Sequence, residues 1–266
     1  CIEVSWVKDA KVRKRLSGLL RGGRMSVVYT QGPPAYLMKL NLHSLDSEDR
    51  KRSIEQTKKL IDEAYYFRAS HFQIIGGEDP GEDRREQATE YLIDSLLELC
   101  EYAEAKAHDY CMIITLENLD RDVHKKFLIG PTAEAVAVVT EVKRVHTNIG
   151  LTLDLAHLPL LGESLQQALK LSREHVVHVH VGNCILRNQD NPRYGDTNPP
   201  FGIEDGENDV NEVTELFVNL DKIGFFRDHK FINKPVVSLE VKPELGEIPE
   251  IILAGSKRVL CQALRL

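Results

Sequence analysis

Long hydrophobic runs are missing from this 266-residue sequence. The longest apolar stretches have the length of a strand, as in residues 111–116, so no segment is predicted to cross a membrane. Residues 8–24 are basic and polar with no apolar stretch behind them, so they do not predict a signal peptide. Cysteine is also scarce. The five cysteines include no CxxC pair, which argues against a disulfide framework and predicts a reducing, cytoplasmic location.

A surplus of positive charge is missing as well. Lys and Arg total 34 against 41 Asp and Glu, which gives a formal net charge of −7. Without an excess of positive charge the chain would bind the phosphates of a nucleic acid only weakly. We therefore expect neither nucleic acid nor a membrane as a partner. What remains is the composition of an ordinary globular protein, with 42% hydrophobic and 28% charged residues.

Short β-rich segments alternate with longer amphipathic segments along the whole chain. This alternation is typical of a parallel sheet covered by helices. No compositional break divides it, so we predict a single domain over residues 1–266. Seven segments have the character of strands: residues 2–7, 26–30, 71–75, 112–117, 149–154, 175–181 and 235–241.

The strand count suggests an incomplete barrel. A closed (β/α)₈ TIM barrel needs eight strands, so we predict one that lacks its first βα unit through truncation at the N-terminus. Residues 2–7 and 235–241 would then form two unpaired edges that are not hydrogen-bonded to each other. Such edges favour pairing with another chain, including a second copy as a homo-oligomer. An open doubly wound sheet is the alternative, but no glycine-rich phosphate loop follows the first strand.

Polar side chains recur at the ends of four strands in the second half of the chain. Successive side chains of a strand point to opposite faces, so residues two apart share a face. In residues 113–117 the face of Ile114 and Leu116 is apolar and must meet helices, which directs Glu117 inward. The same alternation directs four side chains to one axis: Glu117, Asp154, His180 and Glu240.

These four residues are suited to a metal ion. Converging carboxylates repel one another and lose solvation, and a divalent cation removes both penalties. Two Glu, one Asp and one His suit Mn²⁺ or Mg²⁺, with Co²⁺ and Zn²⁺ as alternatives. We therefore predict one divalent metal at the carboxyl ends of the strands, where barrels do chemistry. His178, deeper on the same face, is predicted to be a hydrogen-bonded core residue.

Four motifs carry these residues: ITLEN (114–118), DLAHL (154–158), HVHVGN (178–183) and SLEVKP (238–243). With these motifs the sequence resembles the xylose isomerase-like TIM-barrel superfamily, in its ketose 3-epimerase-like and sugar phosphate isomerase/epimerase branches. The resemblance covers nearly the whole chain and implies that the four strands are the fifth to the eighth of a barrel. It also implies that Glu117, Asp154, His180 and Glu240 are metal ligands.

Further residues are candidates for substrate contacts. The resemblance implies that His157 contacts the substrate and that Arg187 lies where related epimerases place a substrate-binding arginine. The resemblance also implies a His at the position where this chain has Asn198. Lys242 shares a face with Glu240 and is a candidate to hold a substrate oxygen or a phosphate. The alternative interpretation is a solvated loop side chain for Arg187 and a salt bridge to a carboxylate at the barrel rim for Lys242.

The leading hypothesis for function is a metal-dependent isomerase or epimerase of a sugar or sugar-like polyol in carbohydrate metabolism. The metal would stabilise an enediolate while Glu117 and Glu240 transfer protons on opposite sides of the substrate carbon. A lyase or dehydratase on the same scaffold is the first alternative. An endonuclease IV-like phosphodiesterase is disfavoured by the acidic charge, and a catalytically silent binding barrel by the intact set of four. Substrate choice would rest on three predicted loops, residues 31–45, 118–130 and 182–208.

Overall fold

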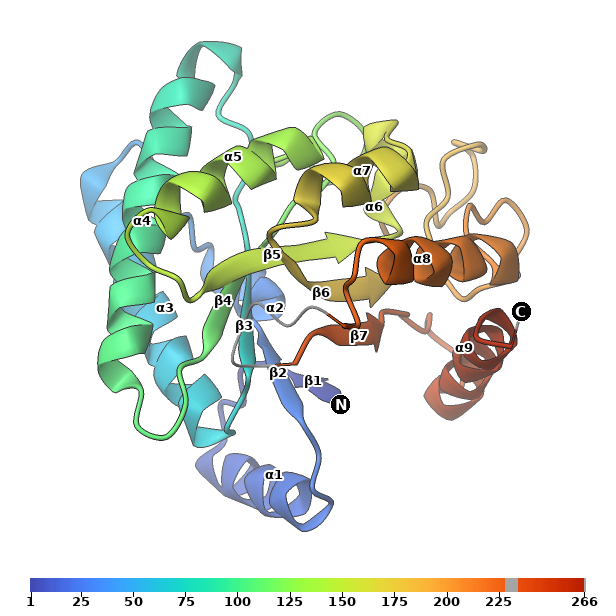
Figure 1. Cartoon of the computed structure of the whole chain (residues 1–266), viewed down its shortest axis with the longest axis horizontal. Coiled ribbons are helices and arrows are strands. Elements are labelled where there is room, and N and C mark those ends of the chain that lie inside the picture. Colours follow the sequence, from blue (N-terminus) through green and yellow to red (C-terminus); the bar gives the residue numbers. More distant parts are fainter. Residues whose placement is uncertain (228–233, 266) are drawn as a thin grey trace.

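The computed structural model describes residues 1–227 and 234–265. Its strands form one parallel sheet in which neighbours along the chain are neighbours in space. The strands are β1 (Ile2–Val4), β2 (Val27–Thr30), β3 (His71–Ile75), β4 (Ile113–Glu117), β5 (Ile149–Asp154), β6 (Val176–Val181) and β7 (Val236–Leu239). The sheet curves into a nearly closed barrel with the helices outside it (Figure 1), as in a TIM barrel that lacks one βα unit.

The helices follow the strands in the predicted alternation. They are α1 (Ala10–Gly22), α3 (Ser47–Tyr66), α4 (Arg85–Lys106, after the 3₁₀ turn Glu82–Arg84), α5 (Thr132–Lys143), α7 (Leu165–Ser172), α8 (Val210–Lys222) and α9 (Pro249–Ala263). Local chemistry sets their starts. Asp46, for example, caps α3 by accepting hydrogen bonds from the backbone N–H groups of Glu48 and Asp49.

Two short helices, α2 (Gly32–Met38) and α6 (His157–Leu161), lie where no helix was predicted. The prediction of a loop over residues 31–45 was wrong at its start. Its Gly-Pro-Pro sequence begins α2. The N–H groups of the first turn of a helix have no partner within the helix, so proline, which lacks an N–H, is tolerated there. Residues 32–38 at the mouth of the barrel are therefore helical, where the prolines had suggested a loop.

The two faces of the sheet differ in chemistry. On the outer face, Ile114 and Leu116 are fully buried in a cluster that includes Leu92 and Leu96 of α4. On the inner face several of the buried side chains are polar, and the Thr152 hydroxyl donates to the Thr115 hydroxyl at 2.8 Å. The core that stabilises the fold therefore lies outside the sheet, which leaves the interior for polar groups.

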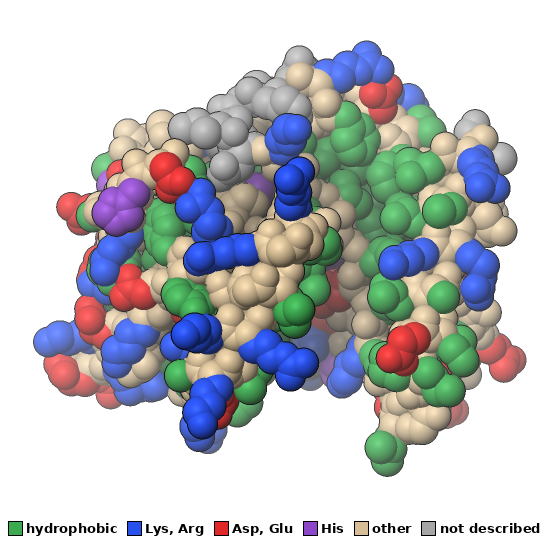
Figure 2. Space-filling view, turned by 90° about the horizontal axis from the view of Figure 1, so that it is seen from below, with side chains coloured by type: hydrophobic (Ala, Val, Ile, Leu, Met, Phe, Trp, Pro, Cys, Tyr) green, Lys and Arg blue, Asp and Glu red, His purple; other side chains and the backbone are tan. Residues whose placement is uncertain are grey.

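One side of the barrel is open. β1 and β7 are the two edges of the sheet, and no ladder joins them in the ranges that the structure describes, as predicted. Both strands are shorter than predicted, so Glu240 follows β7 instead of lying within it. Seen from below, a hollow flanked by hydrophobic side chains separates α1 from α9 (Figure 2). Within the described ranges, no helix is both long enough and apolar enough to span a bilayer.

Candidate metal centre and active site

Four side chains from consecutive strands meet at the carboxyl ends of the sheet. Glu117 and Asp154 are the last residues of β4 and β5. His180 is the penultimate residue of β6, and Glu240 follows β7 directly. One carboxylate oxygen or ring nitrogen from each lies within 4.8 Å of those from the other three. The structure thus brings together all four side chains that the sequence predicts for a metal site.

His180 is the centre of this group. Its Nδ1 is 3.0 Å from Oε1 of Glu117 and 2.7 Å from Oε2 of Glu240. Asp154 is its direct partner across β5 and β6, so the two side chains share the inner face. Glu117, Asp154 and His180 are buried, whereas the side chain of Glu240 is 39% exposed. Glu240 is therefore the one member of the group with substantial contact with solvent.

The charged groups of this centre shift one another's pKa values strongly. Burial lowers the pKa of His180, but Glu3, Glu240 and Glu117 outweigh it and hold that pKa well above its usual range. Burial raises the pKa of Asp154 to about 7, against the opposing influence of nearby histidines. Perturbed groups of this kind gather where a site performs chemistry or holds an ion.

The donor set fits a divalent metal ion. Oδ1 of Asp154 accepts a hydrogen bond from the Ala156 N–H at 2.8 Å. Oδ2 of Asp154 is buried, makes no hydrogen bond among the described residues and lies 3.3 Å from Nε2 of His157. Three carboxylates and one imidazole are ligands that Mn²⁺ and Mg²⁺ accept. A cation among them would bind this oxygen directly and would offset the repulsion among the three carboxylates.

His157 lies beside the centre, at the start of α6. Its Nδ1 is 2.9 Å from the carbonyl oxygen of Asn118. Its Nε2 is 3.3 Å from Oδ2 of Asp154 and 3.4 Å from Oδ2 of Asp196. Burial lowers the pKa of His157, but Asp154 and Asp196 outweigh it and raise the pKa well above its usual range. His157 thus lies at the edge of the group, between Asp154 and Asp196 of the loop of residues 182–208.

The other two predicted substrate residues lie in exposed positions. The side chain of Arg187 is 70% exposed and forms an ion pair with Glu207 of the same loop at 2.9 Å. Lys242 is exposed, and its backbone N–H donates to the carbonyl of Asn198 at 2.7 Å. Neither side chain contacts the four predicted ligands within the described structure, so a role for either depends on a bound substrate.

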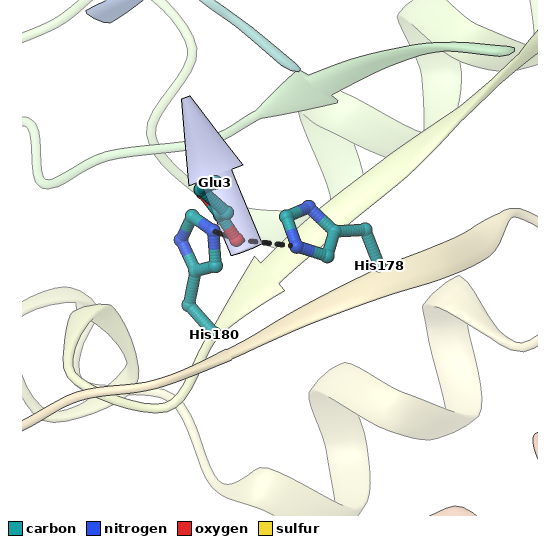
Figure 3. A group of neighbouring side chains, drawn as sticks. All are labelled: Glu3, His178 and His180. Atoms are coloured by element: carbon teal, nitrogen blue, oxygen red, sulfur yellow. Dashed lines mark hydrogen bonds and ion pairs between the residues drawn. The ribbon is translucent and has the colours of Figure 1, made fainter. Parts of the chain in front are cut away.

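Several residues of the site were not predicted from the sequence. Gln73 of β3 donates a hydrogen bond to Oε2 of Glu117, and Glu3 of β1 contacts two histidines of β6 (Figure 3). Both alternate with apolar neighbours, so the rule used for the later strands would have found them. Asp196 was missed because it reaches the site from an irregular loop, where no periodic signal exists. Asn198, which the resemblance had pointed to, comes from the same loop.

Comparisons with known proteins agree with this architecture. A family model described as a xylose isomerase-like TIM barrel matches residues 2–252. A D-psicose 3-epimerase of Ruminiclostridium cellulolyticum is 30% identical over 92 residues, which are 35% of this chain and 29% of that protein. The alignment therefore spans less than a third of that relative.

Solved structures share the fold over almost the whole chain. A D-tagatose 3-epimerase-like protein has a TM-score of 0.73 and 21% identity, covering 99% of this chain and 87% of the other. D-psicose 3-epimerase from Clostridium cellulolyticum H10, solved with D-tagatose, has a TM-score of 0.65 and 19% identity, covering 99% and 86%. At these identities the likeness establishes the fold.

Proposed function

Because this chain belongs to the xylose isomerase-like TIM barrel family, we propose that it is a divalent-metal-dependent isomerase or epimerase of a sugar or sugar-like polyol. Glu117, Asp154, His180 and Glu240 hold the metal in this proposal, with Mn²⁺ or Mg²⁺ as the preferred ion. One observation carries it: three carboxylates and an imidazole offer ligand atoms within 4.8 Å of one another. The free cysteines fit a reducing, cytoplasmic setting.

The chemistry assigned to this centre is proton transfer next to a carbonyl group. A divalent ion held there supplies stabilisation of negative charge on substrate oxygens. Glu117 is buried and is held by Gln73, which keeps its carboxylate oriented. Glu240 is the more exposed carboxylate and can exchange a proton with solvent. We assign removal of the substrate proton to one of them and its return on the opposite side to the other.

His157 and a neighbouring cavity support a small polar substrate. His157 can donate from Nε2 to a hydroxyl group, while its contact with the Asn118 carbonyl orients the ring. A cavity of about 530 Å³ lies at the carboxyl end of β3, lined by residues that include Tyr36, Ile75 and Phe127. Ile75 pairs with Glu117 in the sheet, so this cavity lies one strand away from the centre, although none of the four predicted ligands lines it. Its volume is in the range of small-molecule sites, about 300–1,000 Å³.

Hydrogen exchange from solvent into a ketose tests the proposal. The chain, supplied with Mn²⁺, is incubated in D₂O with a panel of ketoses, ketose phosphates and inositol-like polyols. Deuterium on a carbon next to the carbonyl, together with a new epimer or aldose, is the expected result. If no member of the panel exchanges while Mn²⁺ binds tightly, the proposed reaction is wrong.

A matched pair of variants connects the activity to the centre. Glu240→Gln removes a proton-transfer group and should lower the exchange rate about 10²–10⁴-fold. Glu244→Gln makes the same chemical change on an exposed residue four positions later and should leave the rate unchanged. A loss of only a few-fold in Glu240→Gln, with metal still bound, would exclude Glu240 as the acid or base.

A further inference from the structure

Glu3 reaches into the barrel from β1 and lies between two histidines of β6 (Figure 3). Its Oε1 is 2.9 Å from Nε2 of His178 and 3.2 Å from Nε2 of His180. β1 and β6 are not neighbours in the sheet, so these contacts cross the interior. The Glu3 side chain is 22% exposed, and His178 is fully buried. A carboxylate in this position must be held by its partners, because burial without them is costly.

The two ring nitrogens of His180 face different carboxylates. Nδ1 faces Glu117 and Glu240, at 3.0 and 2.7 Å, and Nε2 faces Glu3. A neutral imidazole carries a proton on one nitrogen and a lone pair on the other. A cation shared with Glu117 and Glu240 requires the lone pair on Nδ1. The proton then remains on Nε2, and Glu3 is the group that accepts it.

We propose that Glu3 is a positioning residue for the metal centre, which accepts the Nε2 proton of His180 and so directs the Nδ1 lone pair toward the metal. This inference rests on the proposed function. A carboxylate behind a metal-binding histidine fixes its tautomer and its ring orientation and makes the ligand more basic. Glu3 touches no substrate in this role.

His178 braces Glu3 from the other side. Its Nε2 donates to Glu3, and its Nδ1 is 3.1 Å from the hydroxyl oxygen of Thr152. This agrees with its predicted role as a hydrogen-bonded core residue. Burial raises the pKa of Glu3, but His180 and His178 outweigh it and hold that pKa well below its usual range. The Glu3 carboxylate thus has an imidazole nitrogen on each side, at 2.9 and 3.2 Å.

Glu3, His178 and His180 form a second candidate cation site, since their ligand atoms also lie within 4.8 Å of one another. Two arguments favour the positioning role. A neutral His180 cannot offer lone pairs from both nitrogens at once. The group that includes Glu117 also contains three carboxylates, whereas the group that includes Glu3 contains one. The first group therefore attracts a divalent cation more strongly.

Titration with Mn²⁺, followed by the electron paramagnetic resonance signal of the free ion, tests the role of Glu3. Wild type should bind one Mn²⁺, and Glu3→Gln should bind it about 10–100-fold more weakly, the usual cost of losing such a partner. Glu3→Asp retains the charge and should bind more tightly than Glu3→Gln. Ser238→Ala is the matched control, because the Ser238 hydroxyl contacts His178 at 3.2 Å but is not bonded to His180. Its affinity for Mn²⁺ should equal that of wild type.

The outcomes separate this inference from the proposed function. If wild type binds no Mn²⁺, the metal centre itself is wrong. If wild type and Glu3→Gln bind equally well, the centre stands and the role of Glu3 is overturned. Two Mn²⁺ in wild type and one in Glu3→Gln would replace the positioning role with a second metal site.

A second measurement needs no variant. In ¹⁵N-labelled wild type loaded with Mg²⁺, long-range nitrogen–proton spectra report which ring nitrogen of His180 carries its proton. We expect the proton on Nε2, protected from exchange by Glu3. A proton on Nδ1 would overturn the inference even if Glu3→Gln failed to fold.

Discussion

Asn198 holds Glu240 in place from the loop of residues 182–208. Its side-chain Nδ2 donates to Oε1 of Glu240 at 2.9 Å, and its carbonyl oxygen accepts from the Lys242 N–H at 2.7 Å. The φ of Asn198 is 51°, in the left-handed region that asparagine tolerates better than most residues. Glu240 follows an edge strand and is partly exposed, so this loop supplies a support that the sheet does not provide.

Asn198→Ala should therefore weaken the metal centre without unfolding the protein. Removing the amide leaves Glu240 free to change rotamer, and we expect Mn²⁺ affinity to fall about 10-fold, the lower end for such partners. Asn188→Ala is the control, because Asn188 donates to Asp205 in the same loop and is exposed. Calorimetric titration of both variants measures the effect. Equal affinities would show that Glu240 does not depend on Asn198.

Because of His71, the first residue of β3, the free energy of unfolding should decrease as the pH is lowered. Its Nδ1 is 2.9 Å from the Ser70 hydroxyl, and its Nε2 is buried with no hydrogen-bond partner in the described residues. Burial, with a smaller contribution from the positive charge of His178, lowers the pKa of His71 to about 3. The unfolded chain binds the proton near its ordinary pKa of 6.5, so the stabilisation present above that pH is lost as pH falls toward 3.

Urea unfolding at pH 8 and pH 5 measures this loss. Between these values protonation of His71 in the unfolded chain should lower the unfolding free energy of wild type by about 2 kcal/mol, because pH 5 lies about 1.5 units below the unfolded-state pKa of 6.5 and still above the folded-state pKa of about 3. The variant His71→Gln cannot titrate and should show a pH dependence smaller by that amount. The difference between the two proteins isolates His71 from the other histidines. Parallel pH profiles would mean that His71 is not the group responsible.

Gly150 should tolerate no side chain. A Cβ at this position of β5 would lie 2.6 Å from Cγ2 of Val177 and 2.9 Å from the carbonyl oxygen of His175. Gly150→Ala should therefore lower the free energy of unfolding by about 1–3 kcal/mol, as overpacked cores do. Gly18→Ala, within α1 and with open space at its Cβ, should raise it by about 0.5–1 kcal/mol. Urea denaturation compares them, and equal stabilities would contradict the packing argument.

The open side of the barrel predicts a response to an added βα unit. We propose that such a unit ahead of residue 1 pairs with both β1 and β7, the two unpaired edges. An extended chain that carries it should melt at a higher temperature, by about 2–4 °C for each kcal/mol gained. It should also bind Mn²⁺ more tightly, because Glu240 follows the edge strand. An extended chain that melts no higher would count against this completion of the barrel.

Period-two patterns made much of the site predictable. The alternation around Glu117, Asp154 and His180 is a property of each strand by itself, and parallel strands place their carboxyl ends at one edge. The same rule, applied to Ile2–Val4, would have predicted an inward Glu3. Helix α2 was missed because two prolines suggested a loop, although a first turn accommodates proline.

The sequence by itself determined the alternation of strands and helices and the side chains that face inward, because both follow from contacts a few residues apart. Only the tertiary structure decided their partners. Glu3 and His180 are 177 residues apart, and their contact depends on how the sheet curves around its open side. Asp196 and Asn198 belong to an irregular loop, which has no backbone period, so its path over the site depends on the packing beneath it.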